Sequence, residues 1–218
     1  MSHGFLQEDR VSIAQQLVDV AKNFADKGWF PATSGNLSVK LTQKPLVFGV
    51  TASGKDKEYL TVNDILLVDG DSKAIEPTQL KPSFETLVHA EVYKQIGEAA
   101  GSVLHVHTMY NNLISELFFT EGKVTLQGIE LIKALNIWEE NAAIDVPIVE
   151  NYADIPKLAA EIGKRLDPRV PGVLIRNHGI YAWGENVQAA KRHVQAFEFM
   201  FEYLFRLLSV QRGAGLLV

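Results

Sequence analysis

Apolar residues recur every three or four positions near both ends of the chain, which is the spacing of one face of a helix. Over residues 9–27 this face holds Val11, Ala14, Leu17, Val18, Ala21, Phe24 and Ala25, and Gly28 follows as a stop signal. Over residues 187–208 it holds Val187, Ala190, Val194, Phe197, Phe201, Leu204 and Leu208. We therefore expect an amphipathic helix in each region, and we expect the second to pack on a sheet or on another subunit.

Between these helices, short runs rich in apolar or β-branched residues predict strands. They cover residues 37–41, 46–51, 65–68, 102–107, 146–149, 173–176 and 180–183. Helical spacing returns over residues 84–96, 108–117, 129–135 and 155–166, and Ser83 is expected to cap the first of these helices. The turn Asn177-His178-Gly179 separates the last two strands. This mixture lacks the regular alternation of a doubly wound fold, so the predicted class is α/β, with helices on the faces of a sheet.

The composition is typical of one globular domain, which we expect to span residues 1–218. Hydrophobic residues make up 47% of the chain and charged residues 22%, and no linker-like segment separates two halves. No apolar stretch reaches the ~20 uninterrupted residues of a membrane span, and no secretory signal is visible. We therefore expect a soluble, cytoplasmic protein without a membrane partner.

Charge and cysteine content argue against other classes of function. A net charge of -5 disfavours sequence-independent binding of nucleic acid, which depends on clustered Lys and Arg. Because the chain has no cysteine, it offers neither a disulfide nor a thiolate ligand. Any metal would therefore be held by His, Asp or Glu.

Two histidines lie two positions apart in the predicted strand at residues 102–107. Because side chains alternate across a strand, His105 and His107 point to the same side and can reach one ion. A catalytic zinc takes three protein ligands and keeps one position open. His178, in a turn beside Gly179, is the candidate for the third ligand. The alternative, two histidines that form hydrogen bonds within the fold, stays open at this point.

The other histidines have simpler interpretations. His3 lies close to the first residue, and His193 lies on the last predicted helix beside its apolar face. His89 follows Glu85 by four positions, as in an ordinary side-chain pair on a helix. We assign none of these three to the metal.

Three segments carry the hydroxyls, small residues and backbone amides that favour an anion. They are Thr33-Ser34-Gly35-Asn36, Thr51-Ala52-Ser53-Gly54-Lys55 and Lys81-Pro82-Ser83. Each segment alone is also what an ordinary loop contains. Their occurrence together with the His-Val-His pair favours a phosphate site for a small anionic substrate.

Two glutamates lie near these segments in the sequence. Glu85 follows Ser83 at the start of a predicted helix, where a carboxylate usually interacts with the helix dipole. Glu130 falls within the apolar stretch 126–135. Burial there would raise its pKa and suit it to proton transfer, so we expect Glu130 to be a buried acid or base.

Taken in order over about residues 14–204, these segments resemble the class II aldolase/adducin family. The resemblance rests on residues 31–38 and 51–57, Lys81-Pro82-Ser83-Phe84-Glu85, His105-Val106-His107, residues 130–135, Arg176-Asn177-His178-Gly179 and residues 181–184. Within the family, these segments are most similar to a dehydratase branch that acts on a methylthio-substituted pentulose phosphate in methionine salvage.

The resemblance implies an α/β/α sandwich around a mainly antiparallel central sheet. It implies Zn²⁺, one per subunit, on His105, His107 and His178, and a homotetramer with sites near subunit contacts. It further implies a phosphate site made by Asn36, Ser53, Gly54, Lys55 and Ser83, with Glu130 as acid and base and Glu85 as a second catalytic carboxylate. Phe84 departs from the pattern, because the family's aldolases tend to have a serine there.

The expected function is therefore zinc-dependent dehydration of a sugar phosphate by a hydro-lyase. A zinc-dependent aldolase or epimerase for a pentulose or deoxyhexulose phosphate is a second interpretation. A non-catalytic, adducin-like binding module is a third. The residues around Glu130 and Trp183 favour dehydration, and the full set of ligands and carboxylates favours catalysis over binding alone.

Overall fold

The computed structural model describes residues 7–213, which fold around one eight-stranded sheet. The strands are β1 (Asn36–Gln43), β2 (Leu46–Thr51), β3 (Ile65–Asp69), β4 (Ser102–Val106), β5 (Lys123–Gln127), β6 (Ala143–Val149), β7 (Gly172–Ile175) and β8 (Gly179–Gly184). Their spatial order is β3-β2-β1-β4-β8-β7-β6-β5. Among these strands β6 and β7 pair in parallel and the other neighbours are antiparallel, so the expected mainly antiparallel sheet is confirmed.

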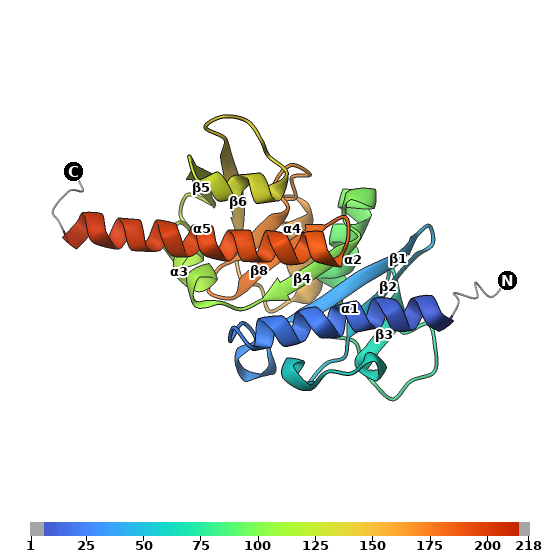
Figure 1. The fold of residues 1–218 in the computed structure, drawn as a ribbon. Coiled ribbons are helices and arrows are strands. Elements are labelled where there is room, and N and C mark those ends of the chain that lie inside the picture. The colour runs from blue at the N-terminus through green and yellow to red at the C-terminus, as the bar shows by residue number, and fades with distance from the viewer. Residues whose placement is uncertain (1–6, 214–218) are drawn as a thin grey trace.

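Helices cover both faces of this sheet (Figure 1). The α-helices are α1 (Gln7–Ala25), α2 (Thr86–Ile96), α3 (Met109–Leu117), α4 (Ile155–Gly163) and α5 (Val187–Gly213). Short 3-10 segments are η1 (Pro31–Thr33), η2 (Lys57–Tyr59), η3 (Val62–Asp64), η4 (Gly97–Ala99) and η5 (Glu130–Leu135). Helices α1 and α5 lie side by side on one face, whereas α2 and α4 pack together on the other. The α/β/α sandwich is therefore confirmed.

Side chains alternate between the two faces of the sheet along the central strands and so contribute to two separate hydrophobic cores. In β4, Leu104 and Val106 pack into the core under α1 and α5, whereas Val103 packs into the core under α2 and α4. His105 must therefore point to the α2 side, because side chains alternate along a strand. Strand β8 repeats the pattern, with Ile180 on the α5 side and Tyr181 on the α2 side. This alternation decides which layer holds the site.

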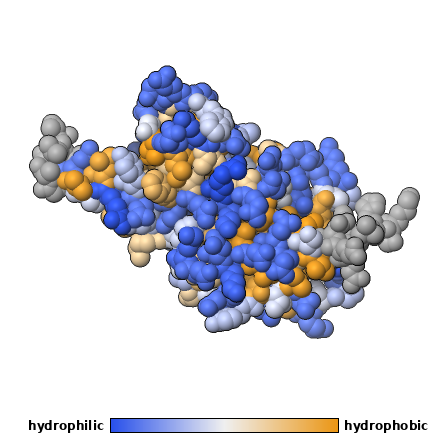
Figure 2. Space-filling view, in the orientation of Figure 1, coloured by the Kyte–Doolittle hydropathy of each residue, from blue (hydrophilic) through white to orange (hydrophobic). Residues whose placement is uncertain are grey.

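Helix α5 packs on the sheet along its predicted apolar stripe. Val187, Ala190, Val194, Phe197 and Phe201 are all buried. Beyond them, Phe199, Tyr203, Leu207 and Val210 stay exposed on the same helix, and Figure 2 shows apolar side chains along its C-terminal part. Among residues 7–213, no helix has the length and apolar character that crossing a membrane requires.

The structure differs from the sequence prediction at three places. Strand β5 was not expected, although the alternation of Lys123-Val124-Thr125-Leu126-Gln127 between exposed and buried positions is a strand pattern. The helix expected at residues 129–135 is the 3-10 segment η5. Ser83 is not the cap of α2: Glu85 occupies the N-cap position, and the carbonyl of Ser83 accepts hydrogen bonds from the amide and hydroxyl of Thr86.

Candidate metal and anion site

The His-Val-His pair lies where β4 ends, in the middle of the sheet. His105 is fully buried on the α2 side, paired across the ladder with Asn36 of β1 and Tyr181 of β8. The Tyr181 ring stacks on the His105 imidazole with ring centroids 4.0 Å apart and planes 8° from parallel. His107 follows β4 by one residue and lines an open cavity. A rigid strand and an aromatic stack therefore fix the first of the two imidazoles.

His178 reaches the same place because its turn approaches β4 closely. A Cβ on Gly179 would lie 2.2 Å from the Val106 carbonyl oxygen, so only glycine fits there. Asn177 takes the left-handed conformation, with φ 50°, that this turn needs. The prediction that a bend beside Gly179 projects the His178 ring into a cleft agrees with this geometry.

Helix α3 holds the His178 turn from the other side. The Asn177 amide donates to Ser115 Oγ at 3.0 Å, and Asn112 Nδ2 donates to the His178 carbonyl at 3.3 Å. The N-cap of the same helix is Thr108, immediately after His107, and the Thr108 hydroxyl caps the helix by accepting from the Asn111 amide. One short helix therefore sets the distance between the second and third histidines.

Four side chains converge into one cluster. Ligand atoms of Glu85, His105, His107 and His178 all lie within 4.8 Å of one another. His105 Nε2 lies 3.4 Å from His178 Nε2 and 2.8 Å from His107 Nε2, and Glu85 oxygens lie 3.3 Å from His105 and from His178. Donors on a tetrahedral zinc, at about 2.0–2.1 Å from the ion, stand about 3.3–3.4 Å apart. The spacing of these donors is therefore compatible with a metal ion.

Hydrogen bonds at Nδ1 orient the imidazoles of His105 and His178 so that Nε2 of each ring faces the cluster. His105 Nδ1 lies 2.9 Å from the Ile180 carbonyl and His178 Nδ1 lies 3.2 Å from Asn151 Oδ1. Because a carbonyl oxygen only accepts, each Nδ1 carries the proton and each Nε2 presents a lone pair to the cluster.

Burial keeps all three imidazoles neutral. Desolvation is the main cause that lowers the pKa of His105, His107 and His178, and for His107 the pKa falls to about 2. Mutual repulsion with neighbouring imidazoles lowers the pKa of His105 and His107 further, whereas the Glu85 carboxylate raises that of His178. The neutral imidazole is the form that coordinates a cation.

The cluster opens into a cavity of about 270 Å³, and most of the predicted anion-binding residues line this cavity. Asn36, Ser53, Gly54 and Ser83 all line it, together with His107 and His178. The second and third anion segments join at its wall, where the Ser53 amide donates to the Lys81 carbonyl at 2.9 Å. The structure therefore brings these segments beside the histidines.

Lys55 is the exception among the predicted anion-binding residues. Its Nζ pairs with Asp64 Oδ1 at 2.9 Å, and Lys55 does not line the cavity. Lys57, two positions later, is only 3% exposed, lines the cavity and donates from Nζ to the carbonyls of Thr33 and Lys55 at 2.9 and 2.8 Å. Burial lowers the pKa of this amine. The structure thus places Lys57, and not Lys55, at the cavity, a difference that the sequence does not show because loop side-chain directions carry no periodic signal.

Ser34 adds an unsatisfied group to the same wall. Its hydroxyl oxygen is buried and forms no hydrogen bond within the described residues. Native proteins rarely leave a buried hydroxyl unpaired, and an acceptor bound in the cavity would satisfy this one. Phe84, in contrast, is 78% exposed on the cavity rim.

Glu130 does not join the cluster within its own chain. Its side chain is 83% exposed and pairs with Lys133 at 2.8 Å. The prediction that it is buried was wrong, because the apolar residues around it belong to two short elements. Leu126 is an inward position of β5, and Ile132 and Leu135 are the inward positions of η5, which turns Glu130 outward.

The remaining histidines lie outside the cluster. His193 is buried in the core and its Nδ1 lies 2.6 Å from the Trp183 carbonyl, so the structural interpretation holds. His89 is not paired with Glu85 on the surface of a helix: it is fully buried, and its ring nitrogens contact Asn36 and Ser38. His3 lies outside the described residues.

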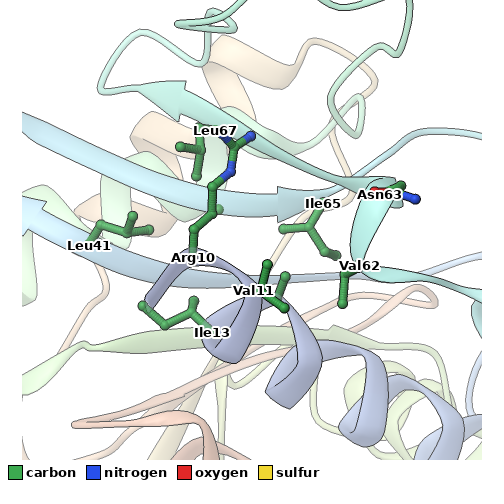
Figure 3. A pocket seen from close by; sticks show the side chains of 10 residues that line it. Arg10, Val11, Ile13, Leu41, Val62, Asn63, Ile65 and Leu67 are labelled. Carbon is green, nitrogen blue, oxygen red and sulfur yellow. The ribbon is translucent and has the colours of Figure 1, made fainter. Parts of the chain in front are cut away.

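A larger hollow of about 460 Å³ lies elsewhere, between α1 and the outer strands of the sheet (Figure 3). Its lining is mainly aliphatic, with Val11, Ile13, Ile65 and Leu67, and Arg10 is its one ionisable residue. Arg10 is paired with Glu76, and the four clustered metal-type donors lie elsewhere. The smaller cavity beside the histidines is therefore the candidate functional site.

Comparison with known proteins finds similar sequences along nearly the whole chain. The profile described as "Class II Aldolase and Adducin N-terminal domain" matches residues 15–205. A protein of Persephonella marina named methylthioribulose-1-phosphate dehydratase is 51% identical over 208 residues, covering 95% of this chain and 96% of its own length. A protein of Bacillus subtilis with the same name is 50% identical over 198 residues, covering 90% of this chain and 94% of its own.

Solved structures with the same fold are more distant in sequence. An L-fuculose 1-phosphate aldolase superposes with a TM-score of 0.75 at 23% identity, covering 91% of this chain and 87% of its own. The L-fuculose-1-phosphate aldolase of Thermus thermophilus superposes with a TM-score of 0.73 at 24% identity, covering 93% and 98%. These likenesses establish the fold.

Proposed function

The chain belongs to the class II aldolase/adducin family, and from that premise we propose that it is a zinc-dependent hydro-lyase of methionine salvage. Its reaction is the conversion of 5-methylthioribulose 1-phosphate to 2,3-diketo-5-methylthiopentyl 1-phosphate and water. The observation that carries the proposal is the meeting of four metal-type donors and three anion-binding segments at one cavity. The names of relatives about 50% identical over nearly the whole chain support the same substrate.

His105, His107 and His178 would hold the cation, with Glu85 within reach as a further ligand or as a group that orients one. Three imidazoles and a carboxylate are a donor set that zinc accepts, although iron, cobalt and manganese accept imidazole as well. A cation bound there supplies a Lewis acid that stabilises negative charge on the carbonyl oxygen of the ketose.

The phosphate would lie against the three loops that carry Ser34, Asn36, Ser53 and Ser83. Lys57 is the cation of this wall, and its ammonium has three N–H donors, of which two are used by the carbonyls of Thr33 and Lys55. The third donor is available to a phosphate oxygen, and a charged donor gives the stronger hydrogen bond. We therefore assign the phosphate to Lys57 in place of Lys55.

The reaction needs a group that removes the proton from C3 and a group that protonates the hydroxyl leaving C4. The assignment of Glu130 to this task requires a neighbouring subunit, because its exposed side chain lies outside the cluster of its own chain. In the proposed homotetramer, Glu130 of one subunit enters the cavity of the next and acts on both protons in turn. Glu85 then orients the ligands of the cation.

A substrate test separates dehydration from the aldolase interpretation. The aldolase interpretation is tested because Glu85, the expected second catalytic carboxylate, lies in the cluster. Purified protein is incubated with 5-methylthioribulose 1-phosphate and, separately, with fuculose 1-phosphate. We expect water loss from the first and no cleavage of the second. Cleavage of fuculose 1-phosphate into two carbonyl fragments, with the first compound untouched, would overturn the proposal. Turnover of neither would favour the binding-module interpretation.

A complementation experiment tests the role of Glu130 across subunits. Neither Glu130→Gln nor His107→Ala alone is expected to turn over substrate, and the Gln variant is expected to keep normal metal content. When the two variants are assembled together in equal amounts, about a quarter of the sites would combine an intact His107 from one subunit with an intact Glu130 from its neighbour. If the mixture stays inactive while Glu130→Gln is also inactive, Glu130 does not act from a neighbouring subunit. If Glu130→Gln turns over like the parent, the residue has no catalytic role.

The expectations of one domain over residues 1–218 and of a cytoplasmic location stay predictions. Elemental analysis of the purified protein is the direct check on the metal. One equivalent of zinc per chain is the expected result, and loss of that zinc in His107→Ala would place it in the cluster.

A further inference from the structure

A chain of buried polar side chains runs from the interior of α2 to the Glu85 carboxylate. Tyr93 Oη lies 2.7 Å from Ser38 Oγ, and Ser38 Oγ lies 2.6 Å from His89 Nδ1. On the other side of the imidazole, His89 Nε2 contacts Asn36 Oδ1, and Asn36 Nδ2 lies 2.9 Å from Glu85 Oε2. The first four of these side chains are at most 3% exposed. Nothing in the proposed reaction so far uses Ser38, His89 or Tyr93.

The chemistry of each group fixes the direction of every hydrogen bond in this chain. An ionised Glu85 only accepts, so the amide of Asn36 must turn its nitrogen to Glu85 and its oxygen to His89. The oxygen of Asn36 then requires a donor, which is His89 Nε2–H. Since burial lowers the pKa of His89 to about 3, the ring is neutral and carries this one proton. His89 Nδ1 is left as an acceptor.

The remaining two bonds follow from the tautomer of His89. Ser38 has one hydroxyl proton, and His89 Nδ1 at 2.6 Å is a far better acceptor than the Val103 carbonyl at 3.4 Å. Ser38 Oγ accepts in turn from the hydroxyl of Tyr93. All four donors therefore point along the chain toward Glu85, and hydrogen bonds aligned in this way strengthen one another.

We propose that His89 is a positioning residue, which holds the Asn36 amide in one orientation and through it holds the Glu85 carboxylate at the metal cluster. This inference rests on the proposed function for its kinetic readout. The Asn36 amide is held from both ends: the Glu85 carboxylate accepts from its nitrogen, and His89 Nε2–H donates to its oxygen. Without the imidazole, the buried oxygen of Asn36 loses its donor, so the amide is free to turn toward another donor and its hydrogen bond to Glu85 is weakened.

A second contact of His89 supports the same role. The ring of Tyr181 meets the His89 ring edge-on, with centroids 5.4 Å apart. The same Tyr181 ring stacks on the imidazole of His105. Tyr181 is fully buried and contacts both rings, so it packs His89 and His105 against one another. His89 is thereby coupled to the cluster through the Asn36 amide and through the Tyr181 ring.

The test compares His89→Gln with His89→Leu. The Gln amide nitrogen can stand near Nε2 and still donate to Asn36, whereas Leu fills the volume without a donor. Loss of an outer-shell partner typically costs 10–100-fold in activity. We expect kcat to fall by about that factor in His89→Leu with a smaller change in KM, and we expect His89→Gln to recover most of the loss.

His193→Leu is the matched control, because His193 is a second buried histidine with one strong hydrogen bond and lies outside the site. It should lower the unfolding temperature without lowering kcat. If His89→Leu is too unstable to purify, Ser38→Ala replaces it. That variant removes the donor to Nδ1 and frees the tautomer, so kcat should fall again.

Crystal structures of the two His89 variants give a readout that does not depend on turnover. Glu85 should keep its place in the Gln variant and move away from Asn36 in the Leu variant. An unmoved Glu85 in His89→Leu, or a kcat within about twofold of the parent, overturns the proposal. If the parent itself fails to dehydrate the expected substrate, the proposed function is wrong, and the crystallographic comparison still decides the role of His89.

Discussion

Glu198 is a buried carboxyl group on α5, and its replacement gives a prediction with a defined sign and size. Burial, opposed by the hydrogen bond from Thr108 and aided by the nearby Glu202, raises the pKa of Glu198 from 4.5 to about 7. The Thr108 hydroxyl donates to Glu198 Oε2 at 2.5 Å. In Glu198→Gln the amide oxygen can accept the same hydrogen bond, but the group no longer ionises.

The direction follows from proton binding. Between pH 4.5 and about 7 the unfolded chain ionises this carboxyl while the folded chain keeps it protonated. The unfolded state therefore binds fewer protons, so the contribution of Glu198 to the free energy of unfolding falls as pH rises through this window. The displacement of the pKa corresponds to about 3 kcal/mol, because one pKa unit is worth about 1.4 kcal/mol. The Gln variant lacks this loss.

The assay is urea unfolding followed by tryptophan fluorescence, at a fixed protein concentration and at several pH values between 4 and 8. The free energy of unfolding of Glu198→Gln, relative to the parent, should increase by about 3 kcal/mol from the acid to the neutral end. Glu140→Gln removes an exposed carboxyl and is the control for the loss of charge. Parallel pH curves for Glu198→Gln and the parent would refute the reasoning.

Three further predictions concern the site. Gly179→Ala should lower the amount of bound metal and destabilise the protein by about 1–3 kcal/mol, because the added Cβ meets the Val106 carbonyl. Gly70→Ala, whose Cβ would make ordinary contacts at 3.4 Å, should keep the metal, and elemental analysis of both variants measures the difference. Lys57→Gln should raise the KM for the sugar phosphate about tenfold or more and weaken inhibition by inorganic phosphate, and Lys55→Gln should do neither. A chelator should lower the unfolding temperature, and zinc at about 100 times its Kd should restore about 3 kcal/mol; an unchanged transition would contradict a resident ion.

The sequence was most informative where a pattern is local. Alternation along residues 102–107 placed His105 and His107 on the same side of a strand, and the structure brings both rings to one point. The stripe on the last helix predicted its buried face correctly. In each case the residues that decide the outcome lie within one element, so the periodicity of that element carries the information.

The errors arose where another element decides the outcome. His89 and Glu85 have the spacing of a helical pair, but Asn36 and Ser38 of β1 lie against α2 and bind the imidazole. A stretch rich in apolar residues suggested that Glu130 is buried, yet a strand and a 3-10 segment share that stretch. No single-element pattern contains such contacts, because they depend on which strand the helix covers.

The position of α3 between two of the histidines has a consequence for how the protein would respond to loss of an ion. Its N-cap residue Thr108 directly follows His107, and its polar side chains hold the turn that carries the last imidazole. Unravelling this helix separates two donors, and a bound cation resists that separation. Hydrogen exchange of the α3 amides should therefore report occupancy of the site, slowing when the ion is present and accelerating when it is withdrawn.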